Sequence, residues 1–162
     1  MFQGDSLMKR ADIEATLRKC LFFKDIEKNN VAKIATLCHT SEYKAGASIF
    51  QQGDLGEYLY VIIEGLVELE RSVTLTDRKG KVVIDRLGRN RMLGCWSTLL
   101  NQPHILMSSA ICQKPTKVIA FKGNDLRRLM EEKTDLGFYM CERLCFLLRD
   151  RIEHAYGALE KI

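Results

Sequence analysis

Glycines divide the middle of this chain into short segments of β-like composition, and this pattern constrains the fold more than any other feature. Between Ser41 and Lys122, β-branched and aromatic residues gather in runs of roughly five to nine residues. The runs are SEYKA, SIFQQ, YLYVII, LVELERSVT, KVVIDRL, ILMSSAIC and TKVIAFK. The separators are Gly46, Gly53–Asp54, Glu64–Gly65, Lys79–Gly80 and Gly88. Because many short strands joined by glycine turns are typical of closed β folds, we expect a barrel or jelly roll.

Segments with helical spacing flank this region on both sides. Residues 11–23 and 27–38 place apolar side chains three and four positions apart, which predicts two short helices. Residues 124–132 predict a third helix, and 136–162, a stretch without proline, predict one long helix. The expected class is α+β and mainly β: a double-stranded β-helix, or jelly roll, with helices at both ends. The expected divisions are 1–7 (a tag remnant or disorder), 8–40 (N-terminal helices), 41–123 (jelly roll) and 124–162 (C-terminal helices).

The long helix carries apolar residues at alternating spacings of four and three. They are Cys141, Cys145, Leu148, Ile152, Ala155, Leu159 and Ile162. This heptad seam continues to the last residue, and such a seam is typical of paired helices. We expect a homodimer through this helix. The alternative is a helix that packs only on its own barrel, in which case the stripe should fade beyond the domain.

Composition narrows the class of protein. The 162 residues have a formal net charge of +4, which is too mild to indicate nucleic acid binding by itself. The six cysteines include no CxxC pair, so we expect free thiols in a reducing cytoplasm and no metal site. The apolar runs are too short to cross a bilayer. No nucleophile elbow, phosphate-binding loop or His–Glu metal motif occurs, so we do not expect an enzyme.

The run YKAGASIFQQGDLGEYLYVIIEGLVELE, residues 43–70, resembles the cyclic nucleotide-binding domain family, with Gly46, Gly53, Gly56 and Gly65 in the family's glycine positions. Residues 84–94 and 116–130 are similar to later parts of the same pattern, so the resemblance covers about residues 12–155. It implies a jelly roll that binds a small effector in a phosphate-binding cassette. Gly94 matches the glycine that opens this cassette, where bulk is expected to push a phosphate away.

The cassette departs from the family pattern at its charged positions. Cys95 stands where the family has a Glu that accepts the ribose hydroxyl, and His104 follows Pro103 where the family has an Arg that pairs with the phosphate. A second register puts Ile105 and Leu106 there instead, and neither register gives a guanidinium between Gly94 and Cys112. Loss of the contacts made by the family's Glu and Arg would weaken the binding free energy of a cyclic nucleotide by about 3–6 kcal/mol, or roughly two to four decades of affinity. The ligand-binding candidates are Gly94, Cys95, Trp96, Ser97, Thr98, His104, Ser108 and Ser109.

Several ways of binding a ligand stay open. Backbone N–H groups of residues 97–99 are candidates for holding an anion, and Arg86, Arg89 and Arg91 for leaning into the site. Ser108 and Ser109 cannot both face inward if they lie on one strand. The resemblance implies cAMP or cGMP as effector. The alternatives are haem, with ligands from Cys95, His104 and Cys112, or a hydrophobic effector.

We therefore expect a cytoplasmic ligand-sensing regulatory domain that signals through its C-terminal helices. The alternative is a degenerate domain that serves only for interaction or dimerisation. We expect no contact with a membrane, and none with nucleic acid by this segment, because no helix-turn-helix follows the long helix. A stand-alone sensor and a piece of a longer regulator both fit the sequence.

Overall fold

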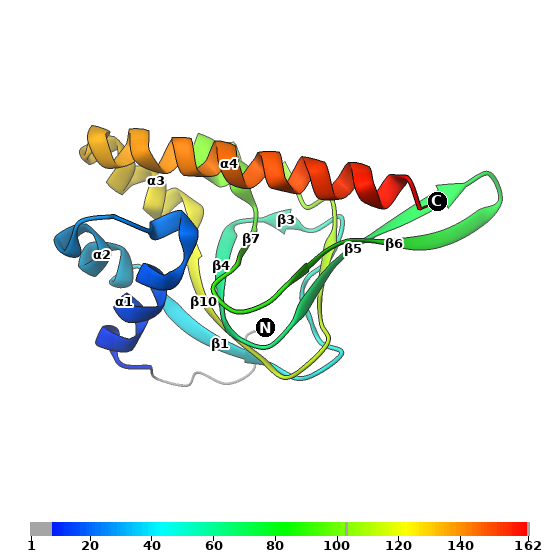
Figure 1. The fold of residues 1–162 in the computed structure, drawn as a ribbon, viewed down its shortest axis with the longest axis horizontal. Helices are drawn as coiled ribbons and strands as arrows, with labels where there is room; N and C mark the ends of the chain where they lie inside the picture. The colour runs from blue at the N-terminus through cyan, green and yellow to red at the C-terminus, as the bar shows by residue number, and fades with distance from the viewer. Residues whose placement is uncertain (1–7, 103, 162) are drawn as a thin grey trace.

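The computed structural model describes residues 8–102 and 104–161, in which helices precede and follow a β-roll (Figure 1). The residues expected to be a tag remnant or disordered, 1–7, lie outside this range. The mixed α+β fold class, an antiparallel β-roll with helices at both ends, is confirmed, although helices account for as much of the chain as strands do. The helical elements are α1 (Arg10–Lys19), the 3₁₀ helix η1 (Leu21–Phe23), α2 (Lys28–Ala35), the 3₁₀ helix η2 (Trp96–Leu100), α3 (Gly123–Glu132) and α4 (Thr134–Leu159).

The roll contains two four-stranded antiparallel sheets, ordered β1-β10-β4-β7 and β2-β9-β5-β6, and a small β3–β8 pair. The longest ladder joins β5 to β6, which extend as a hairpin away from the body (Figure 1). The strands are β1 (His39–Tyr43), β2 (Ser48–Phe50), β3 (Leu55–Gly56), β4 (Tyr58–Glu64), β5 (Val67–Leu75), β6 (Arg78–Leu87), β7 (Met92–Gly94), β8 (His104–Ile105), β9 (Ser109–Cys112) and β10 (Thr116–Lys122).

The sheet that contains β4 and β10 separates two hydrophobic cores. Leu59 and Val61 of β4 face the helices, and the residues between and after them, Tyr60 and Ile62, face the inside of the roll. Strand β10 alternates in the same way. Since both faces of these strands are buried, their sequences are continuous apolar runs rather than alternating ones. The roll and the helices therefore form one packed body around this sheet.

Three local expectations are wrong. The turn between β5 and β6 lies at Thr76–Asp77, where Thr76 has φ +56°, and Lys79–Gly80 are paired inside β6. The run 105–112 is two strands with a bend between them, because Leu106 donates its N–H to Asp54 and accepts one from Gly53. Strand β3 is the third difference, because no strand was expected at Leu55–Gly56.

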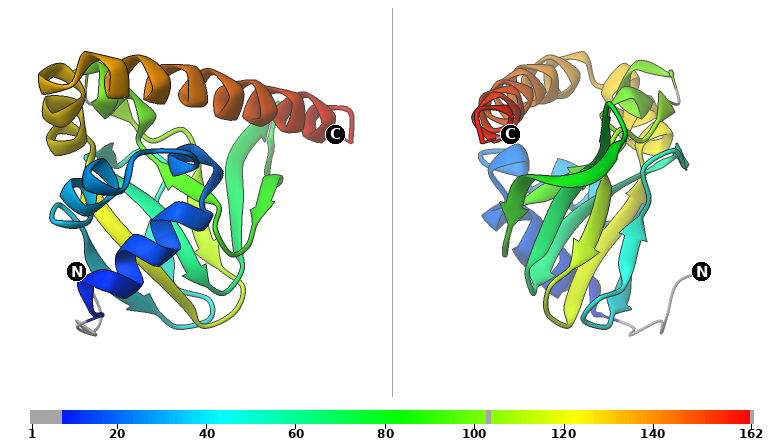
Figure 2. Two further views of the ribbon diagram at one scale, coloured as in Figure 1. Left: turned by 60° about the vertical axis from the view of Figure 1, so that its left-hand side comes forward. Right: turned by 90° about the vertical axis from the view of Figure 1, so that its right-hand side faces the viewer.

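Helix α4 runs across one end of the molecule and continues toward the β5–β6 hairpin (Figure 2). Its first half is anchored by Leu136, Met140 and Leu144, which are buried in the helical core. Its second half lies beside β6, where Ala158 is buried. None of the helices formed by the described residues is long and apolar enough to cross a membrane.

Candidate functional site

A hollow of about 530 Å³ lies between the open end of the roll and the second half of α4. Its volume falls within the range of roughly 300–1,000 Å³ typical of small-molecule pockets. The roll contributes Phe50, Leu69, Ile84 and Leu93 to its wall. The segments Gly94–Ser97 and His104–Ser108 form one side. Leu148, Arg151, Ile152 and Ala155 of α4 form the other.

Gly94 lines this hollow, but its missing side chain does not face it. The residue has φ +125°, a conformation that L side chains rarely adopt. An added Cβ would lie 2.9 Å from Leu59 Cα and would also collide with the carbonyl oxygen of Tyr58. The close approach that requires glycine is therefore to the backbone of β4. The expectation that bulk at this position acts on a ligand is corrected accordingly.

Cys95 turns its thiol toward the β3–β8 pair. Its Sγ lies 3.3 Å from Ser97 Oγ and 3.6 Å from the carbonyl oxygen of His104, to which it donates. The side chain is buried and packs over Gly56, where an added Cβ would lie 2.8 Å from Sγ. The thiol is therefore held by protein groups, and its close packing requires a glycine at position 56.

Trp96 and Thr98 follow Cys95 in η2 but face different surroundings. Trp96 lines the hollow and also contacts Phe22 of η1, with ring centroids 5.9 Å apart. Thr98 is buried outside the hollow, where its hydroxyl donates to the carbonyl oxygen of Cys95 at 2.7 Å and packs against Gly123. The Thr98 hydroxyl therefore bonds back to the start of η2 and Thr98 is not a lining residue, which corrects its assignment as a ligand-binding candidate.

The second half of the candidate set divides in the same way. Ser108 lines the hollow, whereas the Ser109 hydroxyl accepts the backbone N–H of Gln52 at 2.9 Å. Ser109 is not a lining residue, so its assignment is also corrected. His104 lines the hollow and is exposed, with Nδ1 2.7 Å from the carbonyl oxygen of Ile105. Pro103, the other half of the proposed Pro–His pair, lies outside the described residues.

The three arginines that precede the cassette do not line the hollow. Arg86 pairs with Glu68 at 2.6 Å, Arg89 donates to the carbonyl oxygen of Ile63, and Arg91 lies 3.8 Å from Asp85. Cys112, one of the suggested haem ligands, is fully buried in the core of the roll and is also absent from the wall.

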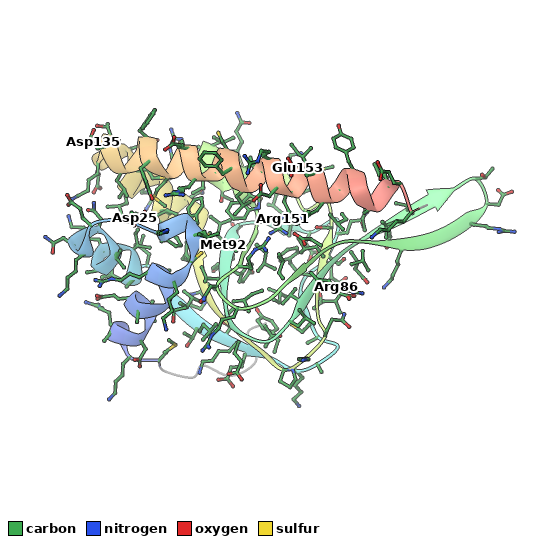
Figure 3. The ribbon with its side chains drawn as sticks, in the orientation of Figure 1. Asp25, Arg86, Met92, Asp135, Arg151 and Glu153 are labelled. Atoms are coloured by element: carbon green, nitrogen blue, oxygen red, sulfur yellow. The ribbon has the colours of Figure 1, made fainter. Side chains whose placement is uncertain are left out.

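The charged group that does reach the hollow is Arg151, which comes from α4 and was not foreseen (Figure 3). Its Nη1 donates to Asp85 of β6, and its Nη2 donates to the carbonyl oxygen of Met92 at 2.8 Å. His154 Nδ1 lies 3.0 Å from the same Asp85 oxygen. The side chains of Asp85 and Arg151 are only 9% and 14% exposed, and desolvation lowers the pKa of Arg151 while the Asp85 charge opposes this. We name Asp85, Arg91, Arg151 and His154 the Asp85 cluster.

Asp85 and Arg151 are 66 positions apart in the sequence, so no local motif predicts that they interact. One feature of the sequence could have indicated the cluster. Arg151 lies between Leu148 and Ile152 of the expected seam, and a charged side chain beside an apolar seam needs a partner. The structure brings most of the seam residues onto one exposed stripe of α4, and three of them, Leu148, Ile152 and Ala155, also line the hollow of their own chain. Ile162, the last seam residue, lies outside the described residues.

The fold and the hollow together define a class of protein, a β-roll domain in which a long helix forms one wall of a space large enough for a small molecule. The family model of the cyclic nucleotide-binding domain matches residues 40–133, which is more than half of the chain. The chain belongs to the cyclic nucleotide-binding domain family, whose members are ligand-sensing regulatory domains.

Individual relatives agree with this assignment. The chain is 28% identical over 95 residues to a cAMP-dependent protein kinase regulatory subunit of Mycosarcoma maydis, a match that covers 59% of this chain and 17% of that protein. A cyclic nucleotide-binding domain from Methylobacillus flagellatus superimposes with a TM-score of 0.78 at 21% identity, covering 100% of this chain and 89% of the other. The sensor domain of the transcriptional regulator DNR from Pseudomonas aeruginosa gives 0.71 at 17% identity, covering 89% and 93%. At these identities the two structures support the fold.

Proposed function

We propose that a small effector enters the hollow and that α4 carries the change to whatever the domain regulates. The observation that carries this proposal is the double role of α4, which supplies one wall of the hollow and is held to β6 by the Asp85 cluster. A ligand that contacts Leu148, Ile152 and Ala155 has a different affinity for the docked and undocked helix. Differential affinity is what a ligand needs in order to shift such an equilibrium.

The single tryptophan of the chain offers a direct test, because Trp96 lines the hollow. Purified protein is titrated with cAMP, cGMP, haem and a neutral apolar dye while tryptophan emission is recorded. We expect at least one of these to give a saturable change that calorimetry reproduces. The same ligand should change amide hydrogen exchange in the second half of α4.

The Trp96→Phe variant is the control for the optical signal and should lose it while keeping the calorimetric heat. If none of the four ligands changes either the emission or the heat, the hollow is not an effector site for these chemistries and the proposal fails. Cyclic nucleotides are tested first because the family is named for them.

We further propose that the domain is regulatory rather than catalytic and works in the cytoplasm. All six cysteines are free thiols, and free cysteines are usual in reducing compartments. Burial raises the pKa of Cys20 to about 11 and that of Cys38 to about 12. These two thiols are therefore inert at neutral pH, which agrees with a structural role.

A second proposal concerns assembly: the exposed stripe of α4 pairs with the same stripe of a second copy. Phe138 extends the heptad spacing of the seam by one step toward the N-terminus and is 76% exposed. Leu159 near the other end of α4 is 57% exposed. Between them Cys141 and Cys145 are exposed as well. An apolar heptad stripe that stays exposed in the single chain is the pattern of a helix with an absent partner.

The predicted consequence is that Phe138→Glu combined with Leu159→Glu gives a monomer in sedimentation, whereas the native chain sediments as a dimer. Neither residue lines the hollow, so ligand binding should persist. The control is Phe146→Glu with Tyr156→Glu, two exposed apolar residues of α4 outside the stripe, which should leave the dimer intact. A native chain that sediments as a monomer, or a double variant with unchanged mass, contradicts pairing through this stripe.

Thiol labelling supplies an independent readout of the same stripe. At neutral pH we expect Cys141 and Cys145 to react rapidly in the monomeric variant and slowly in the native dimer, because pairing would cover them. Cys20 and Cys38 should stay unreactive in both, for the reason given by their raised pKa values. Equal labelling rates for Cys141 and Cys145 in the two proteins would count against pairing.

A further inference from the structure

The wall of the hollow is mainly apolar. Eleven of its seventeen lining residues have aliphatic, aromatic or thioether side chains, and they come from the roll, from the cassette and from α4. Trp96 and Phe50 give it aromatic surface on two sides. Such a wall favours a ligand that loses apolar surface to it, since burial of apolar area is the main favourable term in binding of this kind.

The rim of the hollow is apolar as well, and it is exposed. Ile105 and Met107 on the cassette side are 57% and 63% exposed, and Ile152 on the α4 side is 55% exposed. These side chains face one space from two sides, since all three line the hollow. Contiguous exposed apolar surface of this kind usually marks a binding site and not packing.

Apart from Arg151, the wall offers a few side chains that can form hydrogen bonds with a ligand. Ser97 and Ser108 contribute hydroxyls, and His104 contributes an imidazole. Its Nδ1 lies 2.7 Å from the carbonyl oxygen of Ile105, an acceptor, so Nδ1 donates there and Nε2 is left for a ligand. These groups suit one hydroxyl or carbonyl of a ligand.

The permanent charge among the lining residues is that of Arg151, and this charge is already compensated. Its guanidinium donates to Asp85 and to the carbonyl oxygen of Met92. A phosphate in the hollow would have to displace the Asp85 carboxylate or stay without a charged partner. Burial of an anion without a charged partner is costly, so the wall disfavours an anionic ligand.

We propose that the hollow takes a neutral hydrophobic small molecule, built of rings or an acyl chain and carrying a single hydroxyl or carbonyl group, in preference to a cyclic nucleotide. This inference rests on the proposed function, in which the hollow is the effector site. Ile152 and Leu148 contact the apolar body of the ligand, and Ser108 or His104 binds its polar group.

The probe for this proposal is N-phenyl-1-naphthylamine, a neutral aromatic dye that accepts excitation energy from tryptophan. We expect saturable energy transfer from Trp96 in the native chain. Millimolar cAMP or cGMP should displace none of the dye. Ile152→Lys should weaken dye binding about tenfold or more, because the ammonium group lies at the mouth of the apolar space.

The matched control is Leu159→Lys. Both residues are apolar, lie on the α4 stripe and are similarly exposed, at 55% and 57%, but only Ile152 lines the hollow. Leu159→Lys should change dye affinity by no more than about twofold relative to the native chain, because the added charge stays in water. Both changes act alike on a dimer through the stripe, so the comparison isolates the hollow.

The outcomes separate this inference from the proposed function. Saturation by cAMP or cGMP at micromolar concentration, with release of the dye, overturns the neutral ligand class and leaves the effector site in place. Dye affinity that Ile152→Lys leaves unchanged shows binding elsewhere and also overturns the inference. If the dye, the nucleotides and haem all leave Trp96 emission unchanged, both the inference and the effector function of the hollow fail.

Discussion

Asp85→Ala is expected to lower the free energy of unfolding by about 3 kcal/mol, because it leaves the largely buried Arg151 without a carboxylate. Arg151 has no other carboxylate hydrogen bond within residues 8–102 and 104–161, and Arg91 lies close enough to lower its pKa further. Loss of Asp85 therefore removes the attraction and leaves a repulsion between cations. Denaturant unfolding measures the loss, and amide hydrogen exchange should place it in the second half of α4.

Two comparisons make this prediction specific. The double change Asp85→Ala with Arg151→Met should recover most of the lost stability, since an apolar pair of suitable volume often replaces a buried ion pair without net cost. Lys81→Ala, which removes the exposed Lys81–Glu70 pair on the same strand, should cost less than about 1 kcal/mol. If Asp85→Ala costs no more than Lys81→Ala and α4 exchanges as before, the Asp85 cluster does not hold the helix.

The elements that sequence reasoning placed well are those whose local pattern and tertiary burial agree. Strand β10 has the bounds expected for TKVIAFK, because both of its faces are buried and its apolar run is uninterrupted. Helix α4 was expected from its spacing and its lack of proline, and it begins two residues earlier than expected, at Thr134. The family-like glycine pattern over residues 43–70 predicts the β-roll without any information on strand pairing.

The features that sequence reasoning missed depend on contacts between distant residues. Strands β3 and β8 are only two residues each and exist because Leu55 and Gly56 pair with Ile105 and His104 across the cassette. The Asp85 cluster joins β6 to α4 and has no local signature. The sequence did not indicate which side chains near Gly94 face the hollow, since Thr98 and Ser109 bond to the backbone through their hydroxyls.

Gly94→Ala is expected to lower the free energy of unfolding by about 3–5 kcal/mol, because backbone strain and a collision add at one residue. Gly94 has φ +125°, and an added Cβ would meet the backbone of β4 at Tyr58 and Leu59. Leu59 is the residue that pairs with Gly94 in the β4–β7 ladder. Backbone on both sides of the contact cannot move aside as a flexible side chain would. Denaturant unfolding of the variant measures the cost.

Two other glycines separate the contributions. Gly46 has φ +82° with nothing within 4 Å of an added Cβ, so Gly46→Ala should show the strain alone, about 1–2 kcal/mol. Gly80 lies inside β6 with open space and no positive φ, so Gly80→Ala should be nearly neutral. Equal costs at Gly46 and Gly94 would mean that β7 moves away from β4 without penalty. Any such movement carries Cys95, Trp96 and Ser97 with it, so Gly94→Ala should also weaken whatever binds in the hollow, while Gly46→Ala should not.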